Sequence, residues 1–513
     1  MGESQSNNKR IAKNTLMLYI RMLLSIVVSL YTSRIVLEVL GVEDYGIYGV
    51  VGGVVAMFSF LNSSMAGATS RFLTFEMGQG NTERLKGTFS SALIIHIIIA
   101  LVVLILAETI GLWFLCHKLV IPEGRVAAAH LVYQCSIISS ILSITQVPYN
   151  SLIIAHERMG VYAYIEILNV TLKLLIVYLL TIFNIDKLKL YSILVLSVSA
   201  VVMLIYRIYC MRNFEETRSR LVWDKDILTP MLAFSGWDFY GNMCVAARVQ
   251  GSNFLINNFF GVIANAASSI ATTVNGVIGG FASNIITAFR PRIVKYYSQQ
   301  NWSEMQSMIN NAIKFSTLFL TMLALPVIFE TSYIINLWLG QVPQYVVPFI
   351  RLTLITHCVG IINSVIVISI HATGNIKRIS FLTGTLFLLT IPVSYIFLRA
   401  GFEVIAVYVV NLLSNVFILA LNIYILKKQV NIISVISILR EIASFLIISI
   451  LTAVILFFIF NTMQENFMRL AVLVSVDILL ITTFTYMIAL NKTQRNFVKC
   501  FIKTKLHFKN VNS

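Results

Sequence analysis

Five basic side chains fall inside stretches that otherwise have the composition of membrane-spanning helices: Arg21, Arg34, Lys173, Arg248 and Arg351. A guanidinium or ammonium group near the bilayer centre costs roughly 2.5–3.5 kcal/mol on insertion scales, so such groups persist where they face a wet interior or a partner. Cations gathered at that depth are suited to hold an anion. We therefore predict a hydrated, cationic cavity that binds an anionic cargo.

Arg248 is the first candidate for this cavity, because it lies close to the middle of the predicted span 231–259, too far from either surface to reach the headgroups. The same span carries several polar side chains that a lipid-facing helix would not keep. The amides predicted to form a polar cavity face are Asn242, Gln250, Asn253 and Asn257. The alternative for each amide is a hydrogen bond to a neighbouring helix.

The other four cations are weaker candidates for lining the cavity. Arg34 lies near the outer end of the first span, where it can line the cleft or reach the interface. Lys173 shares a helix face with Glu166, seven residues away, which can neutralise it. Arg21 and Arg351 are less central, and anchoring at the membrane interface is their alternative role.

Acidic residues are scarce in the spans. The candidates for ion coupling or for pairing with a cation are Glu166, Asp238 and Asp477. Asp477 lies in the middle of the last predicted span, and no partner for it is evident from the sequence.

Composition and length predict the elements that position these residues. Of the 513 residues 58% are hydrophobic and only 12% are charged, against about 25% charged in soluble domains. Apolar stretches of roughly 20 residues recur, which is typical of spanning helices. We predict an all-α polytopic membrane protein with about fourteen transmembrane helices. The predicted spans are 15–40, 45–66, 88–113, 125–149, 160–183, 188–210, 231–259, 263–289, 311–330, 344–370, 376–398, 402–426, 438–461 and 467–490.

Lys and Arg are concentrated in the segments that become internal when the spans alternate from an internal N-terminus. The positive-inside rule then places both termini in the cytoplasm. The net charge of +16 is accounted for by topology, and no nucleic-acid-binding module is visible. The basic tail 491–513 is predicted to lie against anionic lipid as an interfacial helix.

An internal repeat divides the chain into two halves. The start of the sequence recurs at an offset of about 220 residues, where Gly41 aligns with Gly261 and Arg71 with Arg292. The alternative is chance, since single-residue coincidences accumulate in long apolar chains. The even number of spans between the copies makes the repeat parallel, as in two lobes that enclose a cleft. The predicted domains are an N-lobe at 1–210, a cytoplasmic linker at 211–230, a C-lobe at 231–427, two further spans at 428–490 and the tail.

Motifs of metal sites and of nucleotide hydrolysis are missing from the sequence. The six cysteines show no C-x-x-C or Cys/His spacing, and no Walker A motif occurs. We expect no metal, no cofactor and no enzymatic activity.

The segment from Thr32 to Tyr48, TSRIVLEVLGVEDYGIY, resembles the first-helix signature of bacterial polysaccharide exporters. These are the Wzx-type flippases of O-antigen and other repeat units, in the multidrug/oligosaccharidyl-lipid/polysaccharide (MOP) superfamily. The resemblance implies two six-helix lobes in a V shape, two additional C-terminal helices and alternating access. It also implies residence in the bacterial inner membrane.

The resemblance further implies a cationic cavity that shields the pyrophosphate and sugars of an undecaprenyl-linked oligosaccharide. Arg248, Arg34 and Lys173 are placed in that role by helix and depth, not by a matched motif. The lipid-linked oligosaccharide, membrane lipids and the polysaccharide polymerase machinery are the implied partners, and lipopolysaccharide biosynthesis is the implied context.

Two alternatives remain open. A drug/cation antiporter of the same superfamily would have about twelve spans and acidic rather than basic cavity residues. A membrane-embedded polymerase or ligase of lipid-linked sugars would need a substantial outer loop, whereas the longest predicted outer loop, at about 330–343, lacks Lys, Arg and His.

Overall fold

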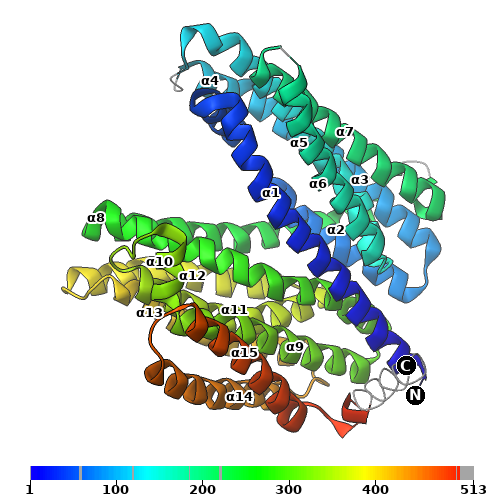
Figure 1. Ribbon diagram of the computed structural model, residues 1–513. Coiled ribbons are helices and arrows are strands. Elements are labelled where there is room, and N and C mark those ends of the chain that lie inside the picture. Colours follow the sequence, from blue (N-terminus) through cyan, green and yellow to red (C-terminus); the bar gives the residue numbers. More distant parts are fainter. Residues whose placement is uncertain are drawn as a thin grey trace, which may run out of the picture. The chain divides into compact units, whose positions relative to one another are not determined.

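Figure 1 shows the computed structural model of the chain, which describes residues 2–56, 60–117, 121–183, 185–218, 222–492 and 494–496. In these residues the regular elements are helices and no strand occurs. The α-helices are α1 (Gly2–Ala56), α2 (Phe60–Gln79), α3 (Thr82–Leu106), α4 (Leu112–His117), α5 (Val126–Ala155), α6 (Met159–Ile182), α7 (Lys187–Asn213), α8 (Lys225–Ser298), α9 (Trp302–Phe329), α10 (Thr331–Leu339), α11 (Val346–Thr373), α12 (Lys377–Arg399), α13 (Ile405–Gln429), α14 (Val435–Thr462) and α15 (Phe467–Phe484). Short π or 3₁₀ turns occur at Ala107–Gly111, Glu123–Arg125, Glu215–Arg218 and Thr485–Ala489.

The predicted all-α polytopic architecture is confirmed. Eleven helices of the described residues are long and apolar enough to cross a membrane. The other three predicted spans, 15–40, 45–66 and 231–259, fall within α1, α2 and the first half of α8, apart from residues 57–59, which the structure does not describe.

Several predicted edges differ from the structure. The outer loop predicted at 330–343 contains the short helix α10, which ends at Gly340 with a left-handed φ of 72°. In addition, α8 continues to Ser298 instead of ending at 289, and α9 begins at Trp302 instead of 311. These extensions are basic and not apolar, so hydropathy does not detect them. The helix continues there because its backbone hydrogen bonds extend beyond the apolar stretch. The predicted tail helix lies mostly in 497–513, outside the described residues.

The two longest helices are each interrupted at one glycine. Gly41 in α1 has φ 78° and ψ 167°, and Gly261 in α8 has φ 77° and ψ −169°. Only glycine adopts this backbone region readily. These are two positions that the internal repeat aligns, so the same local break recurs at matching places, which supports the repeat.

The chain divides into two compact units. Unit 1 comprises Met1–Asn242, Thr287–Asn301 and His371–Phe381, and unit 2 comprises Met243–Ile286, Trp302–Ile370 and Leu382–Ser513. The lobe boundaries inferred from the sequence follow chain order and stay a prediction.

In unit 1, α5 packs on α2, α3 and α7, while α1 packs on α6. Tyr133 of α5 is fully buried, and its hydroxyl donates a hydrogen bond of 2.6 Å to the carbonyl of Ala107, the first residue of a π-helical turn. The same carbonyl accepts the backbone N–H of Leu112, five residues on, so the tyrosine hydroxyl is a second donor to it. Arg125 joins two carboxylates, those of Asp44 and Asp186, and Asp186 also caps the N-terminus of α7.

The described residues of the predicted linker 211–230 belong to unit 1. His156, which follows α5, lies 3.0 Å from the carboxylate of Glu216 and stacks on Phe214 with ring centroids 4.1 Å apart. Burial, the largest single influence, opposes ionisation of Glu216. The hydrogen bond from His156, a backbone hydrogen bond and the charges of His156 and Lys86 together outweigh it and lower the pKa of this carboxyl below its ordinary value.

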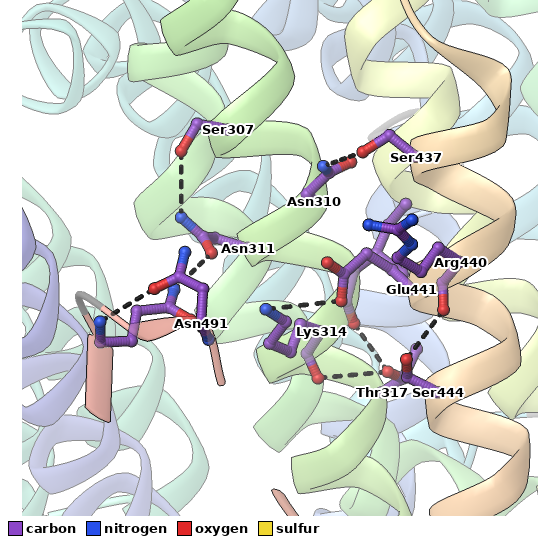
Figure 2. A network of polar contacts seen from close by, with 12 residues as sticks. Ser307, Asn310, Asn311, Lys314, Thr317, Ser437, Arg440, Glu441, Ser444 and Asn491 are labelled. Carbon is purple, nitrogen blue, oxygen red and sulfur yellow. Dashed lines mark hydrogen bonds and ion pairs between the residues drawn. The ribbon is translucent and has the colours of Figure 1, made fainter. Parts of the chain in front are cut away.

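In unit 2, α14 and α15 pack on each other and on α9. Buried ion pairs hold both on α9: Lys314 lies 3.5 Å from Glu441 of α14, and Arg469 of α15 donates a hydrogen bond of 2.8 Å to Glu330 at the end of α9. Figure 2 shows the first pair among hydrogen bonds that include Asn310 to Ser437, at 2.6 Å. The C-terminal hairpin is therefore a fixed part of unit 2.

Candidate functional site

Arg248 lies in the part of α8 that belongs to unit 2, against α12. Its guanidinium carbon is 4.6 Å from the centroid of the Phe387 ring, and its buried Nε has no hydrogen-bond partner. One turn further, Gly251 faces Ile391 so closely that an added Cβ would lie 2.5 Å from that side chain. The glycine permits the close approach of the two helices that places Arg248 over the ring.

No carboxylate of the described residues lies within ion-pair distance of Arg248, and the side chain is only partly exposed. A cation in this position is stabilised by the ring, whose face attracts positive charge. Its remaining donors are available to an anion, because arginine presents its N–H groups in a fork that matches carboxylate and phosphate oxygens.

The amides predicted to form the polar face of α8 have two kinds of environment. Gln250 and Asn257 are exposed in unit 2, although they lie in the same span as Arg248. Asn253 instead accepts a hydrogen bond of 3.0 Å from Ser268, whose hydroxyl in turn accepts one from Tyr408 of α13. Exposed amides at this depth would be unsatisfied in lipid, so their presence favours contact with water.

Asp238 lies in the part of α8 that belongs to unit 1. The amide of Asn242 donates a hydrogen bond of 3.1 Å to it, and His371 Nε2 of α11 lies 3.9 Å from its other oxygen. Arg290, further along α8, interacts with it electrostatically. On the side of α2, Gly67 lies against the same carboxylate.

Arg71 of α2 completes this charged cluster. It donates a hydrogen bond of 2.9 Å to the carbonyl of Ala372, at the end of α11. It also lies over the rings of Phe72 and Phe75, each with its centroid 4.6 Å away. Gly374 has a φ of 80°, and an added Cβ there would lie 2.8 Å from the guanidinium. The cluster thus connects α2, both ends of α8 within unit 1, and α11.

Sequence reasoning found Asp238 and Asn242 but missed Arg71, Arg290 and His371 as their neighbours. The repeat aligned Arg71 with Arg292, two residues beyond Arg290 on the same helix, and this near match was the signal that could have brought Arg71 and Arg290 together.

The remaining predicted cations have local partners or are exposed. Arg21 donates a hydrogen bond of 2.9 Å to the hydroxyl of Tyr162. Arg351 donates one of 2.8 Å to the carbonyl of Ile328. Lys173 is exposed, and the side chain of Arg34 lies outside the described residues. Arg21 and Arg351 thus each have a hydrogen-bond partner within the protein, and their predicted roles in cargo binding or in anchoring stay predictions.

The other two candidate carboxylates differ in environment. Glu166 accepts a hydrogen bond of 3.1 Å from Tyr206 and has no ion pair with Lys173. Asp477 of α15 is fully buried, and neither of its oxygens has a hydrogen-bond partner. Within the described residues, no group of three or more His, Cys, Asp or Glu side chains is arranged to hold a metal ion.

Comparison with known proteins places the fold. The search of protein-family models finds no match. Among curated proteins, the uncharacterized membrane protein EpsK of Bacillus subtilis (strain 168) is 20% identical over 331 residues, 64% of this chain. The match spans 65% of the length of that relative.

Solved structures give a longer match. The outward-facing conformation of a multidrug resistance MATE family transporter of the MOP superfamily has a TM-score of 0.68 and 14% identity, with 83% of this chain and 96% of that chain covered. A MOP superfamily transporter from Pyrococcus furiosus, described as having a binding pocket of reverse polarity that suggests a different function, has a TM-score of 0.67 and 14% identity. It covers 83% of this chain and 96% of its own. The chain therefore has the fold of MATE transporters of the MOP superfamily.

Proposed function

We propose that this protein is a flippase that moves undecaprenyl-pyrophosphate-linked oligosaccharide repeat units across the bacterial inner membrane by alternating access. The observation that carries the proposal is Arg248, a guanidinium without a carboxylate partner in the described residues, on a helix that also carries the exposed amides Gln250 and Asn257. The shared fold supports transport, and the resemblance at 32–48 supports this cargo.

The chemistry of the site fits a phosphorylated, glycosylated lipid. A guanidinium binds phosphate oxygens through charge-assisted hydrogen bonds, which are roughly twice as strong as neutral ones. Amides donate to and accept from sugar hydroxyls. Outward movement of a pyrophosphate from a negative interior is also favoured, by about 2.3 kcal/mol per elementary charge per 100 mV.

A drug/cation antiporter is the second candidate, because MATE transporters are among the structural neighbours. An organic cation would need a carboxylate at the binding site, and the described surroundings of Arg248 offer none within ion-pair distance. The neighbour with a pocket of reverse polarity indicates that pocket charge varies within this fold. A polymerase or ligase is less well supported, because the predicted outer loop at 330–343 is occupied by α10.

Complementation of a flippase-null strain tests the proposal with Arg248→Ala, Arg248→Lys and, as a matched control on an exposed arginine, Arg84→Ala. We expect Arg248→Ala to insert normally, to abolish surface glycan and to cause lipid-linked oligosaccharide to accumulate. Arg248→Lys should retain part of the activity, since it keeps the charge but loses the fork, and Arg84→Ala should complement fully. Full surface glycan with Arg248→Ala would reject the role of this residue. Failure of the wild-type protein to complement, together with altered resistance to cationic drugs, would favour the antiporter.

A further inference from the structure

Asp477 stands out among the carboxylates of unit 2, because it is buried at 0% exposure and has no hydrogen-bond partner at either oxygen. The buried residues of α15 recur every four positions: Arg469, Leu473, Asp477 and Ile481. That spacing defines one helix face, and α15 packs on α9 and α14. The carboxyl group therefore lies in the seam between three helices and not toward lipid.

The register of the seam follows from its ion pairs and from the hairpin turn. Arg469 meets Glu330, so Asp477, two turns further along α15, lies at the level of Thr321 on the antiparallel helix α9. The turn between α14 and α15 likewise places Thr452 opposite Asp477. Thr321 donates to the carbonyl of Thr317, while the buried hydroxyl of Thr452 has no partner.

Ion pairs are found at the two ends of the seam. Lys314 of α9 pairs with Glu441 of α14, and Glu330 pairs with Arg469, which also lies 3.7 Å from Glu465. Lys314 is seven residues from Thr321, and Arg469 is eight from Asp477, which correspond to about 10 and 12 Å along a helix axis. The layer that contains Asp477 thus offers threonine hydroxyls and no cation among the described residues.

An ionised carboxylate in this layer would be a buried charge without a counterion or a hydrogen-bond donor, which is strongly unfavourable. A hard metal cation would neutralise it only with several further oxygen ligands. Among the described residues no group of three or more His, Cys, Asp or Glu side chains could hold a metal ion. A proton neutralises the group with no further ligand.

We propose that Asp477 is a proton-binding site in the seam of α9, α14 and α15, which stays protonated while the three helices are packed. When α15 separates from α9, the carboxyl group reaches water and transfers its proton to a water molecule. The packing of the C-terminal hairpin then depends on pH, whichever molecule the protein transports.

The sign follows from proton linkage. The packed state binds a proton that the separated state releases, so packing weakens as pH rises above the ordinary carboxyl range of about 4. One released proton changes the equilibrium between packed and separated states up to about tenfold per pH unit. This slope continues until the site also titrates in the packed state.

Two measurements on the purified full chain test the proposal. Infrared spectroscopy with ¹³C-labelled aspartate on the wild-type protein at pH 7 should show the carbonyl stretch of a protonated, buried aspartic acid, and Asp477→Asn should lack it. Hydrogen exchange of residues 467–484, corrected for intrinsic rates, should show an opening equilibrium that rises up to about tenfold per pH unit between pH 5 and 8.

Asp477→Asn should abolish this pH dependence, while the exposed control Glu403→Gln should retain it. Absence of a protonated aspartic acid band in the wild-type protein would overturn the proposal, and this measurement needs no variant to fold. An unchanged pH dependence in a folded Asp477→Asn protein would overturn it as well.

Discussion

The ion pair between Arg469 and Glu330 offers a quantitative test of how the C-terminal hairpin is held in unit 2. The side chain of Glu330 is 0% exposed and that of Arg469 is 7% exposed, and the arginine also lies 4.4 Å from the centroid of the Phe460 ring. Removing one partner of a buried pair leaves an uncompensated charge, which costs about 3–5 kcal/mol. Arg469→Met therefore isolates Glu330 in the seam.

We expect Arg469→Met to favour local opening of α15 by a factor of about 100 or more, since each 1.4 kcal/mol is a tenfold change. Hydrogen exchange of residues 467–484 measures this opening, with α7 as the internal reference. The double variant Arg469→Met with Glu330→Leu removes both charges, and its opening should return to within about tenfold of the wild type, because a buried pair can be replaced by apolar groups with little loss.

Glu465→Gln is the matched control. This carboxylate also lies near Arg469, at 3.7 Å, but its side chain is 51% exposed. Exposed pairs are worth about 0–1 kcal/mol, so the change in exchange should be small. Wild-type exchange in Arg469→Met, or a double variant that opens as readily as the single variant, would refute the reasoning.

Two further predictions concern backbone and charge. Gly261→Ala should destabilise the protein by about 1–3 kcal/mol through strain at φ 77°, although an added Cβ would touch nothing within 4 Å. We expect this variant to lose thermal stability in detergent. Gly276→Ala, at an equally open site, should not lose it. The lowered pKa of Glu216 contributes stability that is present above the ordinary pKa of about 4.5 and is lost as pH falls through the lowered value. Hydrogen exchange of 214–218 should therefore accelerate below about pH 4.5 beyond the intrinsic rate, and Glu216→Gln, which has no such titration, should show no added acceleration.

The sequence was sufficient for the features that depend on composition and on local pattern. Apolar length located the helices, and the alignment of Gly41 with Gly261 matched two positions that the structure shows in the same rare backbone conformation. The depth of Arg248 in its span singled out a cation that has no carboxylate partner in the described residues. Each of these is a property of a single segment.

Contacts between segments were beyond the sequence, because they depend on the rotation and register of neighbouring helices. The hydrogen bond from Arg21 to Tyr162 joins residues 141 positions apart. The neighbours of Asp238 come from α2, α11 and the far end of α8. Helix α10 was missed because its nine residues are too few for a spanning signal.

The breaks at Gly41 and Gly261 have a consequence for natural variation. Every single-nucleotide change in a glycine codon that alters the amino acid introduces a Cβ, and an L-amino acid is disfavoured in this conformation whatever its size. Selection should therefore remove substitutions at both places even though space is free around them. A survey that ranks positions by the crowding around them would underestimate the effect of substitutions at both glycines. The handedness of the amino acid, rather than the volume of its side chain, limits which residues these positions accept.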